Sequence, residues 1–211
     1  MSDGAPSMDL VVVVPGSDDR ELMIGALSRP EALKIRPPTE VVYVVYSRHD
    51  PGCAEPVELL RLYIRQCAHA LVVFDREGSG HSKSREEIET DVERRLRASG
   101  WGDRARAVVI EPELEAWVWS DSPEVDAVLG WAGRKPTLRE WLVQRGFLAE
   151  GDNKPADPKE ALQAALREVR KPRSAVIYRQ LAERVSLSRC TDPAFAKLRS
   201  VLREWFPADE G

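Results

Sequence analysis

Residues 10–14 read LVVVV, and three more short apolar runs follow along the chain: VVYVVY at 41–46, ALVVF at 70–74 and AVVI at 107–110. All are rich in β-branched residues and show little polar alternation, which is typical of strands buried on both faces of a parallel sheet. The segments between them predict helices. This alternation of strands and helices predicts an α/β fold, with a four-stranded, mainly parallel sheet flanked by helices.

The predicted helices have apolar residues at helical spacing and recognisable starts. Ser84 and Glu87 stand at the spacing of a capping box, and several later helices begin at a proline that follows Ser or Asp. We also expect Pro112 to open a helix. The helices are predicted at 18–28, 56–66, 84–98, 123–129, 137–145, 158–169, 175–185 and 193–205.

The strand pattern stops at residue 110, and the remainder is all helical. We therefore expect an α/β domain over residues 1–121 and a helical C-terminal extension over 122–211, packed together as one unit. All six Trp residues lie beyond residue 100, and packing in the core explains them best. His69, at the start of an apolar run, is predicted to be a core histidine.

The composition is that of an ordinary globular chain. Of 211 residues, 43% are hydrophobic and 31% are charged, and the net charge is -4, which excludes fibrous and disordered classes. The apolar runs are far shorter than the roughly 20 residues that cross a bilayer, and the first residues do not resemble a secretory signal. We expect a cytoplasmic protein without membrane association. Its three widely spaced Cys residues predict reduced thiols rather than disulfides.

The mild net charge conceals an asymmetry. Residues 1–130 carry a balance of -9 and residues 131–207 a balance of +7. A basic half in such a chain indicates an anionic partner, DNA or RNA, although a solvated helical surface explains it equally well. The candidate nucleic-acid-binding residues are Arg167, Arg170, Lys171, Arg173 and Arg179.

Carboxylates follow each predicted strand. Because ligands bind beyond the carboxyl ends of the strands in open parallel sheets, these residues are expected to meet at one edge. Hard oxygen ligands suit Mg²⁺, whose chemistry is phosphoryl transfer or phosphodiester hydrolysis. The alternative is a set of polar loops. The predicted metal ligands are Asp75, Glu77, Glu111 and Glu115, of which Asp75, Glu77 and Glu115 are also the candidate catalytic residues.

Three segments resemble a TOPRIM-like (Rossmann-like) family of uncharacterised bacterial proteins associated with phage-defence loci. LVVFDREG at 71–78 is similar to the family's Asp-x-Asp motif, with Glu77 in place of the second Asp. ELEAWVWSD at 113–121 resembles its Glu-Ala-Trp motif, which an aspartate (here Asp121) follows after four residues. The segment 192–198 resembles its closing helix.

The resemblance implies a Mg²⁺-dependent, nucleic-acid-cleaving component of an anti-phage system, with other defence proteins as partners. A subunit of a methylation-associated system fits it as well. One departure stands out, because Pro15 occupies the position of the family's catalytic glutamate. Asp18, Asp19 or Glu21 in the following turn is the candidate substitute.

Two further functions stay open. The loss of the glutamate at Pro15 is typical of a catalytically degenerate subunit that binds partner proteins. A small-molecule phosphotransferase would use the small-residue loop at 78–84, where His81 is a candidate proton donor or ligand. A mobile loop over the sheet edge is the simpler explanation of this segment.

Overall fold

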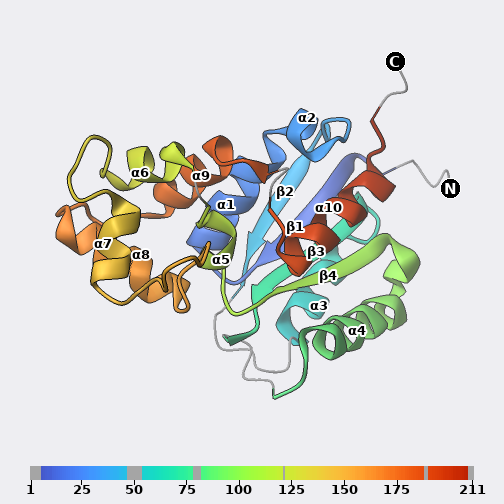
Figure 1. The fold of residues 1–211 in the computed structure, drawn as a ribbon. Coiled ribbons are helices and arrows are strands. Elements are labelled where there is room, and N and C mark those ends of the chain that lie inside the picture. The colour runs from blue at the N-terminus through green and yellow to red at the C-terminus, as the bar shows by residue number, and fades with distance from the viewer. Residues whose placement is uncertain (1–5, 47–53, 78–81, 121, 188–189, 209–211) are drawn as a thin grey trace, which may run out of the picture.

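The computed structural model describes residues 6–46, 54–77, 82–120, 122–187 and 190–208. At its centre lies a parallel sheet of four strands in the order β2-β1-β3-β4 (Figure 1). The fold class predicted from the sequence is confirmed. The strands are β1 (Met8–Val14), β2 (Val41–Val45), β3 (Cys67–Asp75) and β4 (Ala105–Ile110).

The helices occupy the connections and the C-terminal half. Within the described residues, no helix is both long enough and apolar enough to cross a membrane. The α-helices are α1 (Ser17–Leu27), α2 (Pro30–Leu33), α3 (Ala54–Leu60), α4 (Arg85–Leu96), α5 (Glu115–Val118), α6 (Pro123–Leu129), α7 (Leu138–Gln144), α8 (Pro158–Glu168), α9 (Ala175–Arg184) and α10 (Pro193–Trp205). Shorter helical segments are η1 (Arg61–Tyr63), η3 (Arg97–Trp101) and η4 (Gly102–Arg104).

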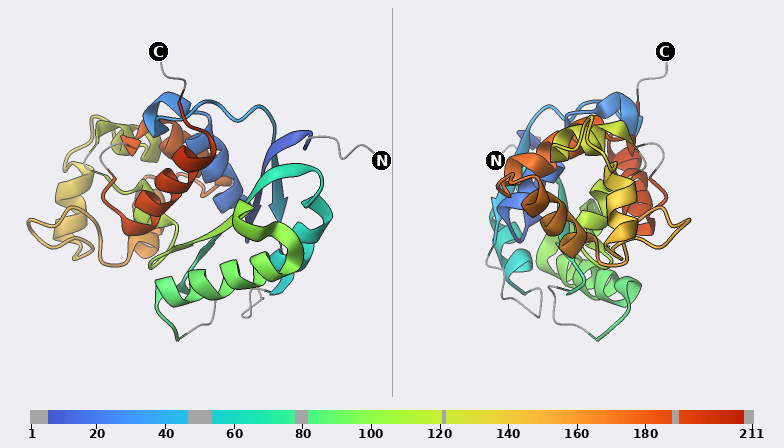
Figure 2. Two further views of the ribbon diagram at one scale, coloured as in Figure 1. Left: turned by 90° about the vertical axis from the view of Figure 1, so that its right-hand side faces the viewer. Right: turned by 60° about the vertical axis from the view of Figure 1, so that its left-hand side comes forward.

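Both faces of the sheet are covered, as the continuous apolar runs predict. In β1, Val11 and Val13 face a core that α3 and α4 close, whereas Leu10, Val12 and Val14 face a larger core shared with α1, α9 and α10. Figures 1 and 2 show α6, α7 and α8 grouped beyond one end of the sheet. The helical half therefore packs both on one face and at one end of the α/β unit.

The contact between α1 and α9 is unusually close because Gly25 lies in it. A Cβ atom at this position would lie 2.7 Å from the Arg179 carbonyl oxygen and 2.9 Å from the Ala182 Cβ. Only a glycine lets the two helix backbones approach so far. This contact fixes α9 against the segment that follows β1.

Side chains of α4 occupy the outer edge of β4. Glu89 accepts a hydrogen bond from the Val109 N–H at 3.0 Å, and Glu93 accepts one from the Ala107 N–H at 3.1 Å. Lys197 of α10 donates to both carboxylates, at 3.1 and 2.8 Å. The edge strand, α4 and α10 are thus joined by one charged network.

The helix expected from Pro112 begins three residues later, with α5 at Glu115. The prediction was wrong because the pairing of the two strands continues past their ends. The Arg76 N–H donates to the Ile110 carbonyl at 2.8 Å, and the Glu77 N–H donates to the Pro112 carbonyl at 3.4 Å. These bonds hold residues 110–112 beside the β3 chain and delay the helix.

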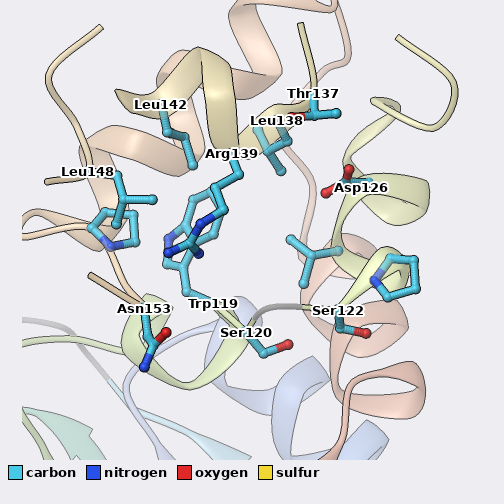
Figure 3. Close-up of a pocket in the computed structure, with 13 residues that line it drawn as sticks. Trp119, Ser120, Ser122, Asp126, Thr137, Leu138, Arg139, Leu142, Leu148 and Asn153 are labelled. Atoms are coloured by element: carbon cyan, nitrogen blue, oxygen red, sulfur yellow. The ribbon is translucent and has the colours of Figure 1, made fainter. Parts of the chain in front are cut away.

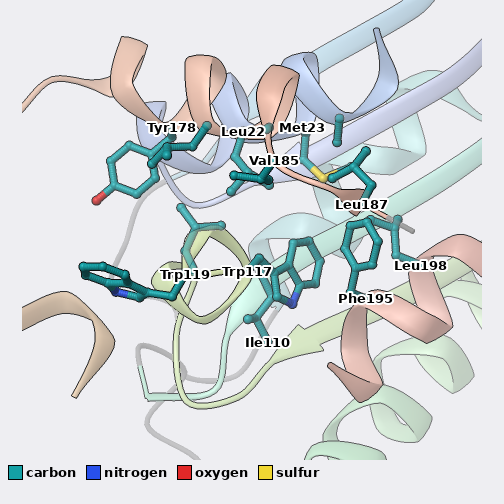
Figure 4. Packing of buried hydrophobic residues seen from close by; sticks show 14 of the residues in the cluster. Leu22, Met23, Ile110, Trp117, Trp119, Tyr178, Val185, Leu187, Phe195 and Leu198 are labelled. Carbon is teal, nitrogen blue, oxygen red and sulfur yellow. The ribbon is translucent and has the colours of Figure 1, made fainter. Parts of the chain in front are cut away.

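All six Trp side chains are buried, with 1–8% of their surface exposed, which confirms that they serve packing. Figure 4 shows Trp117 and Trp119 projecting in different directions from α5 into the larger core. Trp117 meets Phe195 of α10 edge to face at 5.2 Å, and the Trp119 Nε1 donates to the Pro158 carbonyl of α8 at 2.8 Å. The two tryptophans therefore join α5 to opposite parts of the helical half.

His69 of β3 lies partly buried under the end of α10. Its ring stacks on Trp205 at 4.6 Å and meets Phe206 edge-on at 5.6 Å. Its Nδ1 is buried and has no hydrogen-bond partner among the described residues. Burial lowers the pKa of His69 below 6.5, and the nearby Arg104 lowers it further against the opposing effects of Asp9 and Glu204.

We expect the contribution of His69 to stability to fall as the pH decreases below about 6.5. His69 stays neutral in the fold while the unfolded chain takes up a proton, so acid favours unfolding in the window between the two pKa values. Denaturant unfolding at pH 5.5–7.5 measures this, and His69→Phe, which keeps the ring packing, should flatten the slope. An unchanged slope in His69→Phe would contradict the assignment.

Candidate functional site

Acidic side chains from three connections lie close enough to influence one another at the carboxyl edge of the sheet. Asp19 lies in the first turn of α1, directly after β1, and Asp75 is the last residue of β3. Glu113 and Glu115 follow β4. Three of these residues are almost fully buried: Asp19 is 6% exposed, Glu113 4% and Glu115 2%. We call these four residues the acidic cluster.

Asp75 is the member of the acidic cluster on which the other acids act most clearly. Its Oδ1 is buried and lacks a hydrogen-bond partner in the described part of the chain. Burial raises the pKa of Asp75 well above its usual value, and the charges of Asp19, Glu115 and Glu113 raise it further, whereas Lys159 opposes them. Without a cation at this place, the carboxyl group is therefore protonated over an unusually wide pH range.

Glu115 is held by Tyr178 of α9 and by Arg173, which lies just before α9. The Tyr178 hydroxyl donates to its Oε1 at 2.6 Å, and the Arg173 guanidinium lies 3.8 Å away. Burial raises the pKa of Tyr178, and the Glu115 charge raises it further, so the phenol stays a hydrogen-bond donor. Arg173 also forms an ion pair with Asp18 and donates to the Tyr178 hydroxyl.

Glu113 is held by the start of α8. It accepts hydrogen bonds from the Lys159 backbone N–H at 2.7 Å and from the Lys159 Nζ at 3.3 Å. Burial, followed by the Glu115 charge, raises the pKa of Glu113. For Lys159, burial opposes ionisation, but Glu115, Glu113 and Asp75 together raise its pKa. A stably charged ammonium group thus lies beside the acidic cluster.

The structure brings together only part of the predicted metal-ligand set. Asp75 and Glu115 lie in the acidic cluster, whereas Glu77 is exposed and Glu111 forms an exposed ion pair with Arg76 at 2.7 Å. Two carboxylates two residues apart share a direction only while a strand continues. β3 ends at Asp75, and Glu77, two residues beyond it, is exposed.

The other candidate site residues predicted from the sequence lie in several places. Asp19 is in the acidic cluster, and Asp18 is next to it in the ion pair with Arg173. His81 and Asp121 lie outside the described residues. Lys159 and Tyr178 were not predicted as site residues, since no local pattern distinguishes a lysine at a helix start or a tyrosine on an apolar helix face.

The predicted nucleic-acid-binding residues also separate into two groups. Arg173 contacts Asp18 and Glu115, and the Arg179 Nε lies 2.7 Å from the Glu21 Oε2, so both lie among acids of α1 or the acidic cluster. Lys171 donates to the Val128 carbonyl. Arg167 and Arg170 are exposed.

Comparison with known proteins shows similarity in fold. No protein-family model and no curated protein matches the chain. The C-terminal region of the Burkholderia pseudomallei OLD protein matches with a TM-score of 0.51 at 12% identity, over 93% of this chain and 98% of that one. The C-terminal region of the Xanthomonas campestris pv. campestris OLD protein gives a TM-score of 0.48 at 16% identity, over 93% of each chain. The first match shows that the sheet and the helical half together form a known arrangement.

Proposed function

We propose that this chain is a divalent-metal-dependent component that acts on nucleic-acid phosphodiesters, with the acidic cluster as its metal site. The observation that carries the proposal is the buried, unpartnered Oδ1 of Asp75 among other acids. A buried carboxyl group in that setting needs a proton or a cation. The fold, similar to the C-terminal region of an OLD protein, supports the same proposal.

Carboxylate oxygens are the ligand type that Mg²⁺ and Mn²⁺ prefer. Among the described residues, no group of three or more Asp, Glu, His or Cys side chains is placed to hold an ion. Mg²⁺ in phosphate-handling sites, however, is commonly held by one or two carboxylates plus waters and substrate phosphates. Asp75 and Asp19 supply two such carboxylates. A cation there would polarise a phosphate and lower the pKa of a bound water.

The remaining groups of the site are suited to position a substrate phosphate. Lys159 carries a stable positive charge next to Asp75, and cations of this kind stabilise the charge on a phosphoryl group. Tyr178 and Arg173 hold Glu115 in place. The exposed Arg167 and Arg170 are the proposed contacts to the nucleic-acid backbone.

Calorimetric titration with Mn²⁺ tests the metal site. We expect wild type and Glu77→Gln to bind the ion, and Asp75→Asn to bind it at least about 10-fold more weakly, since one of the two carboxylates is lost. Glu77→Gln is the matched control because it removes the same charge two residues away, on an exposed side chain. Equal binding by Asp75→Asn and wild type, or no binding by wild type, contradicts the proposal.

A second function, a non-catalytic subunit that binds partner proteins, is favoured by specific contacts. Lys159 neutralises Glu113, and Tyr178 and Arg173 hold Glu115, so half of the acidic cluster is stable without metal. Pro15 also stands where the resembled family has its catalytic glutamate. Nicking of supercoiled plasmid by wild type with Mn²⁺, absent in Asp75→Asn, would reject this second function.

The biological setting proposed from the resemblance is anti-phage defence, with other defence proteins as partners. A plaque assay on cells carrying the gene and its neighbours tests this setting. Protection that is lost on deletion of this gene supports it, and protection that is unchanged contradicts it.

A further inference from the structure

A cavity of about 280 Å³ lies beside α5, between α6, α7 and residues 148–155 (Figure 3). It is separate from the acidic cluster and shares none of its residues. We call it the Trp119 pocket. The lining residues used in the argument are Trp119, Ser120, Arg139, Leu142, Leu148 and Asn153.

The walls of the Trp119 pocket combine flat, apolar and hydrogen-bonding groups. Figure 3 shows the Arg139 side chain extending toward the Trp119 indole, with Leu142 and Leu148 on one side and Asn153 at the edge. Arg139 donates to the Asp152 carbonyl, which holds it over the pocket.

Ser120 also lines the pocket. Its Oγ is buried without a hydrogen-bond partner in the described part of the chain.

These groups suit a nucleobase. Proteins hold unpaired bases by stacking them on aromatic rings or on the planar guanidinium of Arg, and by bonding their edges to amides. Because the Trp119 indole is only 5% exposed and its Nε1 already donates to the Pro158 carbonyl, Arg139 and Asn153 are the groups proposed for these two roles. The volume is slightly below the range of about 300–1,000 Å³ typical of drug-sized ligands, which favours one planar ring system.

The position of the pocket links it to the acidic cluster. Trp119 follows Glu115 by four residues, and the Trp119 N–H donates to the Glu115 carbonyl at 3.3 Å, so the two residues lie about 6 Å apart along one helical turn. Lys154, next to Asn153, donates to the Ala116 carbonyl of the same turn. A phosphate at the acidic cluster and a base in the pocket would therefore belong to neighbouring parts of one bound strand.

We propose that the Trp119 pocket binds a base of a single-stranded segment whose phosphate lies at the acidic cluster. This inference rests on the proposed function and adds to it the substrate class, a strand with at least one unstacked base. The same groups would recognise the base of a free nucleotide, so the experiment compares an oligonucleotide with a mononucleotide.

The test measures binding of a short single-stranded DNA oligonucleotide in Mn²⁺, with a parallel series that carries one abasic site at each position. Arg139→Ala should weaken binding about 5- to 100-fold, the range of one base-stacking contact. One abasic position should weaken it similarly, and the two changes should not add. Arg145→Ala is the matched control, because it removes the same charge from the end of the same helix outside the pocket.

The outcomes separate this inference from the proposed function. If Mn²⁺ binds at Asp75 but Arg139→Ala and every abasic oligonucleotide bind like their parents, the pocket inference fails alone. If wild type binds neither Mn²⁺ nor oligonucleotide, the proposed function fails with it. If deoxyadenosine monophosphate binds as tightly as the oligonucleotide and still requires Arg139, the pocket serves free nucleotides and the strand proposal is overturned. Retention of the thermal unfolding midpoint in Arg139→Ala shows that the fold is intact.

Discussion

Without metal, the Asp75→Asn variant should unfold at a higher temperature than wild type at pH 7–8. Burial and the neighbouring acids raise the pKa of Asp75 in the folded protein above its value of 3.8 in the unfolded chain. The stability that the protonated carboxyl group contributes is therefore lost as the pH rises from 3.8 through the pKa of the folded state. The amide has the same shape without the charge. We expect a gain on the order of 1 kcal/mol, measured by thermal unfolding, that grows from pH 4 to pH 8.

Saturating Mn²⁺ should reverse this order. At 100 times the dissociation constant, a ligand stabilises the folded state by about 2.7 kcal/mol, and only wild type has the complete site. Glu77→Gln should follow wild type in both conditions. An Asp75→Asn variant that is less stable than wild type at every pH without metal would show that Asp75 has a structural role instead.

The Gly25→Ala variant should lose about 1–3 kcal/mol of stability, the usual cost of overpacking. The added methyl group would lie 2.7 Å from the Arg179 carbonyl oxygen, and backbone atoms cannot move away cheaply. α1 and α9 would have to separate. Denaturant unfolding measures the loss, which corresponds to a decrease of several degrees in the melting temperature.

Two comparison variants make the Gly25→Ala result specific. Ser17→Ala, at the exposed start of the same helix, should change stability by less than about 0.5 kcal/mol. Adding Ala182→Gly to Gly25→Ala should not restore the loss, because the backbone contact at 2.7 Å remains and a glycine inside α9 itself costs about 1 kcal/mol. A Gly25→Ala variant as stable as wild type would show that the two helices adjust without cost.

The sheet and most helices could be predicted because their signals are local. Four Val-rich runs gave the strands, and prolines after Ser or Asp gave the starts of α6, α8 and α10 as the structure has them. The capping box at Ser84 is present, with the Glu87 N–H donating to the Ser84 Oγ at 3.3 Å. The four-residue helix α2 was missed because one turn carries too little periodicity to recognise.

The candidate site was predicted less well because it depends on contacts between distant segments. The position of Asp75 follows from the end of a strand, but the exposure of Glu77 depends on the path of the chain after that strand. Lys159 reaches Glu113 across 46 residues of sequence, and Tyr178 reaches Glu115 across 63. Only the folded arrangement of α8 and α9 brings these pairs together.

The charged network on β4 has a consequence for the behaviour of many copies in solution. An edge strand with free N–H groups is a template on which another chain can add a strand, and this is how many proteins begin to aggregate. In β4 the Ala107 and Val109 donors already bond to Glu93 and Glu89. The Lys197 ammonium keeps both carboxylates in place. This border of the sheet is therefore closed to growth by its own side chains, so that the protein is protected there against polymerisation.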